Sequence, residues 1–538
     1  MNNPGSVSAA PLTGHGFGGH FAARLLDFTA DTTPWQRRLW NVGTVLALRE
    51  VCEAGQWIGA QVLSPAALHW LCRDLERLAG DDTGVGEPEV RRQLQGALRA
   101  DLSEHSRHRR RLHELINLID ESYIARWVVA ADASTGASPE RLSRAVAAHL
   151  LDRGYSMGFL HRTVRHLMAA GATTGDLLDE AAQLASASSR QFDVLVPFLA
   201  VPQQQLLAEG LPEWRDGSQV RAWLAMNAPA HSARQNGAFL YSIQAMDPYA
   251  AGRRAGELLD RLLARSSYTR HNRSGLKPSG WLRVKGLDES LALEPPARGV
   301  DVLSLEKERT LYRILEQDLL DNALELAAPL NRGSRGPAVA GGWAALESVL
   351  YNPGDQADRK DGRAIAAIRM AAMVTCSWPR AELTALSYEH QPGIPDLLTQ
   401  ELANATTNRE RAIAVAAAIQ AGRPLVTRQA SDAAAVSRMA TLVASPRRSL
   451  QGARMVVEGT LRRLYRQRNI VLHGGSTQAV GLDATLRTAA PLVGAGLDRI
   501  AHAYLVDRIL PLALAAKAEL RLGLVGTQNA PSVTGLLE

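Results

Sequence analysis

Apolar residues recur at helical spacing along most of the chain, which predicts a mainly α protein. In the first part the pattern runs from about Pro34 to Ala187, with a start signal at Ser138-Pro139-Glu140 and a glycine stop at Gly154. We therefore expect a helical N-terminal domain over residues 34–190. Residues 1–33 begin with a stretch rich in Gly, Ser and Pro, and we expect them to form a flexible terminus.

The periodicity changes between Phe192 and Gly286, where shorter apolar runs favour strands. Such runs are Phe192 to Leu199, Ala238 to Ile243 and Trp281 to Lys285. They predict a small α/β module over residues 191–290. After the second run, Asp247 can cap and Pro248 can open a helix, so Asp247 has a structural role available.

The stretch from Leu291 to Gly299, which contains Pro295-Pro296, predicts a linker into a second helical region over residues 300–525. This region shows no strand signal and no repeat of fixed period. Its candidate helices run from Ser304 to Ala328, Ala338 to Tyr351, Arg363 to Cys376, Asp396 to Ala421, Leu450 to Leu472 and Asp483 to Leu522.

The charge of the chain matters only where cations gather. Lys and Arg number 60 against 54 Asp and Glu, a net charge of +6 on 538 residues, and a clustered excess suits a polyanion such as RNA. One cluster is the run His105 to His113. A second lies on the helix that ends near Leu472 and comprises Arg447, Arg448, Arg454, Arg462, Arg463 and Arg466. Each cluster fits either a phosphate-binding surface or a solvated helix face.

Several classes of protein are disfavoured. The cysteines Cys52, Cys72 and Cys376 lie far apart, which indicates neither a disulfide framework nor a zinc site and fits a reducing cytosol. No apolar run approaches the ~20 residues that span a bilayer, and no secretion signal opens the chain, so we expect a cytoplasmic protein without a membrane partner. No metal-binding helix, nucleophile elbow or Walker loop is found, and we expect neither metal nor cofactor.

The segment from Leu464 to Gly475 carries the best chemical signal. Arg468 and His473 bracket four residues, and Asn469 follows the arginine directly. The spacing alone is weak, because Arg144 and His149 share it inside an ordinary amphipathic helix; we assign that pair to structure. The asparagine and the helix stop at Gly474-Gly475 set the first pair apart.

This segment resembles the ribonuclease motif of the HEPN superfamily. Upstream, Gly342-Trp343-Ala-Ala-Leu346-Glu347 resembles the Trp-x-x-Leu-Glu helix of the Apea-like HEPN group, so the resemblance covers roughly residues 300–525. It implies a C-terminal HEPN-type helical bundle that cleaves RNA without metal, and two copies of the motif that meet in a homodimer. It also implies a role as a toxin or in anti-phage defence, with an antitoxin or a phage-derived trigger as a further partner.

The chemistry can be stated without the family. RNA cleavage without metal needs a base for the 2′-hydroxyl, an acid for the leaving oxygen and a cation for the charge on the phosphate. His473 suits proton transfer, Arg468 suits phosphate, and Asn469 can orient the imidazole or bind an oxygen. Glu347 is expected to pair with Arg468 or Arg466. Arg462 and Arg463 are expected to bind RNA.

Helix geometry limits how the two main residues can meet. A step of five residues at about 3.6 per turn points their side chains about 140° apart, so we expect the glycine pair to end the helix and let His473 turn toward Arg468.

Three competing hypotheses remain at this point. The Arg468–His473 pair can be purely structural, with the arginine paired to an acid. The C-terminal domain can be a non-catalytic HEPN module that serves as an interaction or nucleotide-binding scaffold. A DNA-binding regulator ranks last, because no recognition helix is apparent.

Overall fold

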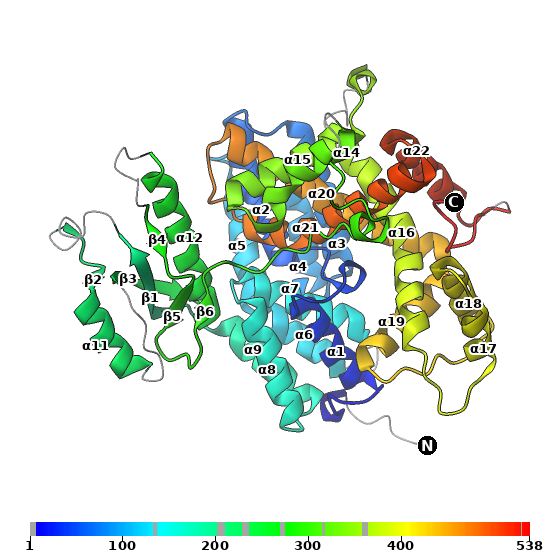
Figure 1. Cartoon of the computed structure of the whole chain (residues 1–538), viewed down its shortest axis with the longest axis horizontal. Coiled ribbons are helices and arrows are strands. Elements are labelled where there is room, and N and C mark those ends of the chain that lie inside the picture. Colours follow the sequence, from blue (N-terminus) through cyan, green and yellow to red (C-terminus); the bar gives the residue numbers. More distant parts are fainter. Residues whose placement is uncertain are drawn as a thin grey trace. The chain divides into compact units, whose positions relative to one another are not determined.

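The structure is a computed structural model that describes residues 7–132, 137–201, 210–228, 236–268, 275–314, 318–357, 364–528 and 530–538. Its contacts group the chain into two compact units. Unit 1 comprises Met1–Asp152, Val164–Ala182 and Ala297–Glu538, and unit 2 comprises Arg153–Thr163 and Gln183–Pro296. Helices dominate and one small sheet lies in the middle of the sequence, which confirms the mainly α fold class with a small α/β module (Figure 1).

Unit 1 is mainly helical; the helices named below belong to it, except that residues 157–163 of α8 and 183–186 of α9 belong to unit 2. Those that precede the sheet are α1 (Phe17–Thr29), α2 (Thr44–Gly59), α3 (Pro65–Asp81), α4 (Pro88–Leu98), α5 (Arg107–Glu121), α6 (Tyr123–Asp132), α7 (Pro139–Asp152), α8 (Met157–Ala169) and α9 (Thr174–Ser186). Those that follow it are α13 (Ser304–Lys307), α14 (Leu319–Arg332), α15 (Arg335–Leu350), α16 (Ile365–Glu389), α17 (Leu397–Asn404), α18 (Asn408–Gln420), α19 (Ala430–Ala444), α20 (Pro446–His473), α21 (Leu482–His502) and α22 (Pro511–Leu524). Short turns are η1 (Val7–Ala9), η2 (Trp35–Arg37), η3 (Thr83–Val85), η4 (Pro353–Ala357) and the π turn η5 (Ala503–Asp507).

The N-terminal segment that was expected to be flexible contains helix α1. Helix α1 buries Phe21, Leu25 and Phe28 and packs against α7 and α19. The glycines serve close packing, since a Cβ built on Gly19 would lie 1.9 Å from the carbonyl oxygen of Gly14. Residues 1–6 lie outside the described residues.

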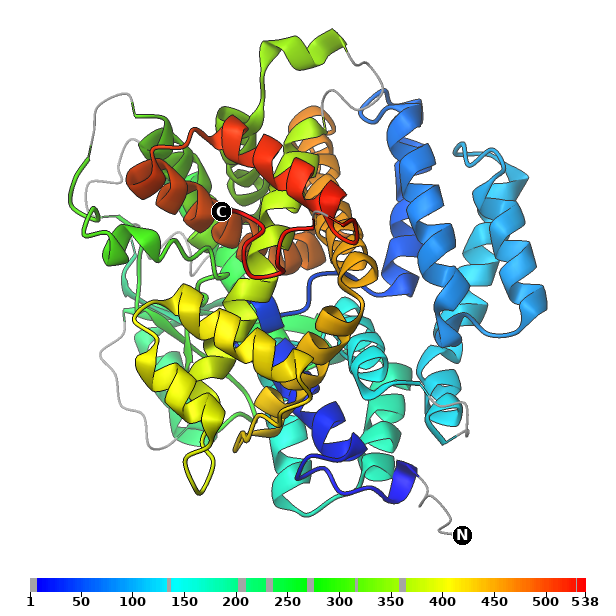
Figure 2. The same cartoon turned by 90° about the vertical axis from the view of Figure 1, so that its right-hand side faces the viewer.

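Unit 1 brings N-terminal and C-terminal segments together, as the blue and orange-to-red helices of Figures 1 and 2 show. Buried Arg37 of η2 donates to Glu382 of α16 and to Asp432 of α19, at 2.7 Å each. Glu382 also accepts from Arg438 at 3.0 Å. A buried charge is stable only when it is paired, so Arg37 and its two acidic partners must stay together. These contacts therefore join η2 to helices that lie about 400 residues later in the chain. The division of residues 34–190 and 300–525 into separate domains stays a prediction.

Some helix boundaries differ from the expected ones. The helix expected from Asp483 to Leu522 is interrupted after α21 by η5, by Arg508 in the left-handed region (φ 58°) and by Pro511. Helix α19 was not expected at all. The region from Ser304 to Ala328 contains the short α13 and most of α14, and residues 315–317 between them lie outside the described residues. The expected helix start at Arg363 also lies outside the described residues.

Unit 2 contains the small sheet, with strands β1 (Arg190–Ala200), β2 (Trp214–Asp216), β3 (Gly237–Ala245), β4 (Lys277–Pro278), β5 (Trp281–Val284) and β6 (Leu291–Ala292) and helices α11 (Gly217–Asn227) and α12 (Pro248–Ser266). The order is β2-β3-β1-β5-β6, with β4 beside β1, and the pairs are antiparallel. The expected strands are confirmed.

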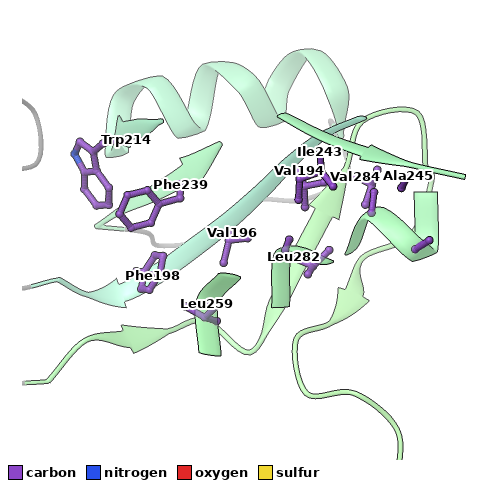
Figure 3. Close-up of a cluster of buried hydrophobic side chains, with 13 residues drawn as sticks. Val194, Val196, Phe198, Trp214, Phe239, Ile243, Ala245, Leu259, Leu282 and Val284 are labelled. Carbon is purple, nitrogen blue, oxygen red and sulfur yellow. The ribbon is translucent and has the colours of Figure 1, made fainter. Parts of the chain in front are cut away.

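Side chains alternate across this sheet. Val194, Val196 and Phe198 of β1 share a buried cluster with Phe239 and with Leu259 of α12 (Figure 3). Leu195 points to the opposite face, where Val220 and Leu224 of α11 cover it. The period of two thus places a helix against each face.

Asp247 has the structural role expected for it. The fully buried carboxylate accepts from the backbone N–H of Ala250 at 2.8 Å and caps α12. It also accepts from the backbone N–H and hydroxyl of Ser156, at 2.7 and 2.9 Å, beside the start of α8. One carboxylate therefore satisfies donors at the beginnings of two helices.

Candidate functional site

Arg468, Asn469 and His473 occupy the last two turns of α20, the longest helix in the described part of the chain. The helix ends at His473, and the N–H of Gly474 still bonds to the carbonyls of Asn469 and Ile470. Gly475 follows with a φ of +63°, which other residues rarely adopt. The glycine pair thus ends the helix directly after the histidine, which is therefore exposed.

The side chains of these three residues meet. Nη1 of Arg468 donates to Oδ1 of Asn469 at 2.9 Å and lies 3.4 Å from Nε2 of His473. Asn469 is buried, whereas Arg468 is half-buried. The long arginine side chain and the position of His473 at the helix end together overcome the angular separation of about 140°.

The contact between Arg468 and His473 also constrains the proton on the imidazole. A guanidinium only donates, so a hydrogen bond between the two side chains requires Nε2 of His473 as the acceptor and places the proton of a neutral ring on Nδ1. An unprotonated Nε2 beside a fixed cation is the form of histidine that can take a proton from a hydroxyl group.

Glu347 lies beside this group, with Oε2 3.9 Å from Nη2 of Arg468. Helix α15 brings it there because Trp343, one turn earlier, packs against Tyr465 of α20 with ring centroids 4.8 Å apart. Of the two partners that the sequence offered for Glu347, Arg468 is the one in range. Both side chains are partly exposed, so the pair orients the arginine more than it stabilises the fold.

Arg466, the other expected partner of Glu347, points elsewhere. It is buried, with Nη2 3.7 Å from Oε2 of Glu50 on α2, and burial lowers its pKa to about 10. The same carboxylate accepts from Nε of Arg463 at 2.8 Å. These two arginines therefore pack α20 against α2.

Arg462 and Arg463 do not form the solvent-facing surface that was expected to bind RNA. Both are buried. Nε of Arg462 donates to Glu458 at 2.8 Å, and its guanidinium lies over the ring of Trp70 at 4.8 Å. Arg447 and Arg448 are exposed, but they begin α20 and lie about 30 Å along its axis from Arg468. The C-terminal half of α20 is thus no basic track.

Helix α2 supplies residues close to the site that no motif in the sequence marks. A Cβ built on Gly474 would lie 2.7 Å from Cζ3 of Trp57, so the ring packs directly on the turn after His473. The carboxylate of Glu53 accepts from the N–H of Val480 at 3.2 Å and holds the far end of the same loop. Burial, with a contribution from Glu50, raises the pKa of Glu53 to about 7.

The one local signal for these residues is that Glu50, Glu53 and Trp57 share a helix face at spacings of three and four. Their partners lie more than 400 residues away, beyond the reach of any periodicity.

Arg144 and His149, which share the spacing of Arg468 and His473, are used structurally. Arg144 pairs with Glu140 at 2.9 Å within α7, and the ring of buried His149 stacks on Tyr123 at 4.8 Å. In the described residues, no group of three or more His, Cys, Asp or Glu is placed to hold a metal ion. Over the same residues, no helix is both long and apolar enough to cross a membrane.

Comparison of the chain with protein-family models, curated proteins and solved structures gives no match.

Proposed function

We propose that the protein is a metal-independent endoribonuclease whose active site is formed by Arg468, Asn469 and His473. The observation that carries the proposal is the contact of one guanidinium with both the Asn469 amide and His473 Nε2 at an exposed helix end. The resemblance of this segment and of the Trp343–Glu347 segment to HEPN proteins supports the same function.

In the proposed reaction, the 2′-hydroxyl of a bound ribose replaces Arg468 as the hydrogen-bond donor to Nε2 of His473, Nε2 takes its proton, and the 2′-oxygen attacks the adjacent phosphorus. The bond to the 5′-oxygen breaks, which leaves a 2′,3′-cyclic phosphate and, after protonation of the leaving oxygen, a 5′-hydroxyl end. Arg468 stabilises the charge on the phosphate, and Asn469 and Glu347 keep the guanidinium in place. The leaving oxygen needs an acid, and each chain offers one such histidine.

A homodimer through the C-terminal helices would provide the second histidine. The loop after α20 is bordered by two apolar side chains, those of Leu472 and Val480. Each is about half exposed. Apolar side chains that border a site in this way suit burial against a second copy of the chain. We expect the dimer to form through this surface.

The test incubates purified protein with total RNA in the presence of EDTA. Wild type is compared with Arg468→Ala, Asn469→Ala and His473→Ala, and with Arg448→Ala as a matched exposed control on the same helix. We expect fragments with 2′,3′-cyclic phosphate ends from wild type and the control only. Loss of a general base or of the phosphate-binding cation each lowers the rate by about 10²–10⁴-fold.

Equal cleavage by all five proteins, or cleavage that EDTA abolishes, would overturn the proposal. If none of the folded, dimeric proteins cleaves RNA, the alternative function as a non-catalytic scaffold gains support. The contact of Arg468 with Glu347 is also compatible with that alternative, because an ion pair can orient an arginine that takes part in no reaction.

The proposed cellular role follows from the resemblance alone. It is that of a cytoplasmic toxin or anti-phage effector, with RNA as substrate and an antitoxin or a phage-derived trigger as its regulator. Toxicity on expression that disappears with His473→Ala is the expected result.

A further inference from the structure

The start of α5 carries exposed cations. Arg107, Arg110 and Arg111 are exposed, as is His113 on the next turn. Within the described part of the chain, none of the three arginine side chains forms a hydrogen bond or an ion pair. They differ in this from Arg462, Arg463 and Arg466 of α20, which are buried beside acidic residues.

These arginines sit at the unfavourable end of their helix. The N-terminus of a helix carries a partial positive charge that favours acids, yet the first turn of α5 contains no acidic residue. The three guanidinium groups repel one another, and the partial positive charge at the N-terminus of α5 repels each of them. An external polyanion would relieve both effects, which makes this a surface suited to a row of phosphates.

The surface is held firmly on α2. Nε of Arg109 donates to the carbonyl of Cys52 at 3.1 Å, and a Cβ built on Gly55 would lie 2.1 Å from the carbonyl oxygen of Leu102, just before α5. The loop that leads into α5 therefore rests on α2 with no side chain between them.

Helix α2 also links this surface to the candidate site. From Cys52 to Trp57 the helix rises about 8 Å, and Trp57 packs on Gly474, the residue after His473. The cations of α5 and the end of α20 are thus attached to neighbouring parts of one helix within unit 1.

We propose that Arg107, Arg110 and Arg111 bind the phosphate backbone of single-stranded RNA and hold it beside the Arg468–His473 site. This inference rests on the function proposed above, and it assigns substrate binding to the N-terminal half of the chain. Recognition is through phosphate, so it has little dependence on base sequence.

Binding is measured in the His473→Ala protein, so that the RNA stays intact, by the fluorescence anisotropy of a labelled oligouridine at several salt concentrations. The test variant adds Arg107→Gln, Arg110→Gln and Arg111→Gln. The matched control instead adds Arg261→Gln, Arg265→Gln and Arg448→Gln, which removes three exposed arginines elsewhere and gives the same net charge.

Each phosphate contact on a single strand contributes about 0.7 to the slope of log K against log salt. Loss of three contacts should therefore reduce the magnitude of the slope by about 2 in the test variant. At about 0.1 M salt, this variant should bind RNA on the order of a hundredfold more weakly than its parent, whereas the control should bind about as tightly as the parent. Unchanged binding by the test variant, equal losses in both variants, or no binding by the parent at low salt would each overturn the inference.

An oligonucleotide of deoxyuridine is the second arm of the experiment. Equal affinity for the DNA strand agrees with binding through phosphate, whereas selective binding of the DNA strand would contradict the assignment to RNA. If the test variant loses RNA binding but wild type does not cleave RNA, this inference is upheld and the proposed activity is refuted. If wild type cleaves RNA in a way that depends on His473 but the test variant binds RNA as well as its parent, the activity is upheld and this inference is refuted.

Discussion

Glu50 of α2 allows the packing beneath the candidate site to be tested. Its buried carboxylate lies 2.8 Å from Nε of Arg463 and 3.7 Å from Nη2 of Arg466. Two guanidinium groups thus share one carboxylate, and burial, with a smaller contribution from the neighbouring charge of Arg463, lowers the pKa of Arg466 to about 10. Glu50→Gln keeps the shape and one acceptor oxygen but removes the carboxylate charge that both arginines contact.

The expected loss follows from the burial of the cluster. Removing one partner of a buried ion pair costs about 3–5 kcal/mol, because the remaining charge stays out of water. The amide oxygen of Gln can still accept from Arg463, so we expect the free energy of unfolding to fall by about 3 kcal/mol. Urea unfolding followed by circular dichroism measures the change through the shift in midpoint.

The matched control is Glu89→Gln, which removes an exposed pair with Arg92 at 2.5 Å. Because surface pairs contribute little, that variant should stay within about 0.5 kcal/mol of wild type. A loss below about 1 kcal/mol for Glu50→Gln would refute the reasoning, since it would mean that water or another acid reaches Arg463 and Arg466.

Three further predictions concern single positions. Burial raises the pKa of Glu53 from 4.5 to about 7. The protonated carboxyl therefore contributes its full stability below pH 4.5, and this contribution is lost as the pH rises through about 7. The urea midpoint of wild type should fall relative to that of Glu53→Gln between about pH 5 and pH 8. Asp247→Ala should lower the unfolding free energy by about 2–3 kcal/mol, because it leaves donors of Ala250 and Ser156 unpaired in a buried place; urea unfolding with Asp247→Asn as the milder comparison tests this. Gly55→Ala should destabilise by about 1–3 kcal/mol despite the better helix propensity of alanine, because the added methyl group meets the Leu102 carbonyl; a thermal midpoint at or above that of wild type would contradict it.

The features that could be predicted from sequence are those set by short-range chemistry. The short apolar run that includes Val194, Leu195 and Val196 indicates a strand, and Asp247-Pro248 gives a helix start. The end of α20 follows from the conformational freedom of its two glycines. In each case the residues that decide the structure are neighbours in the sequence.

The features that could not be predicted depend on distant partners. The glycine-rich start of the chain has the composition of a flexible terminus, but helix α1 packs against α7 and α19, and Gly19 closely approaches Gly14. The arginines of α20 look like a solvated or RNA-binding face until Glu50 is placed beside them. A charged residue on a helix is buried only when another segment supplies its counter-charge, and local periodicity does not contain that information.

Helix α2 contacts both ends of the loop that follows the candidate site. Trp57 packs where the loop after His473 begins, and Glu53 holds Val480 near its end. Four residues farther along α20 from the Arg463–Glu50 contact lies Gln467, directly before Arg468. A shift of α2 would therefore act directly on both α20 and the loop after it, which together position His473. Any displacement of α2 therefore has a direct physical route to the Arg468–His473 contact, because packed helices rearrange between discrete positions.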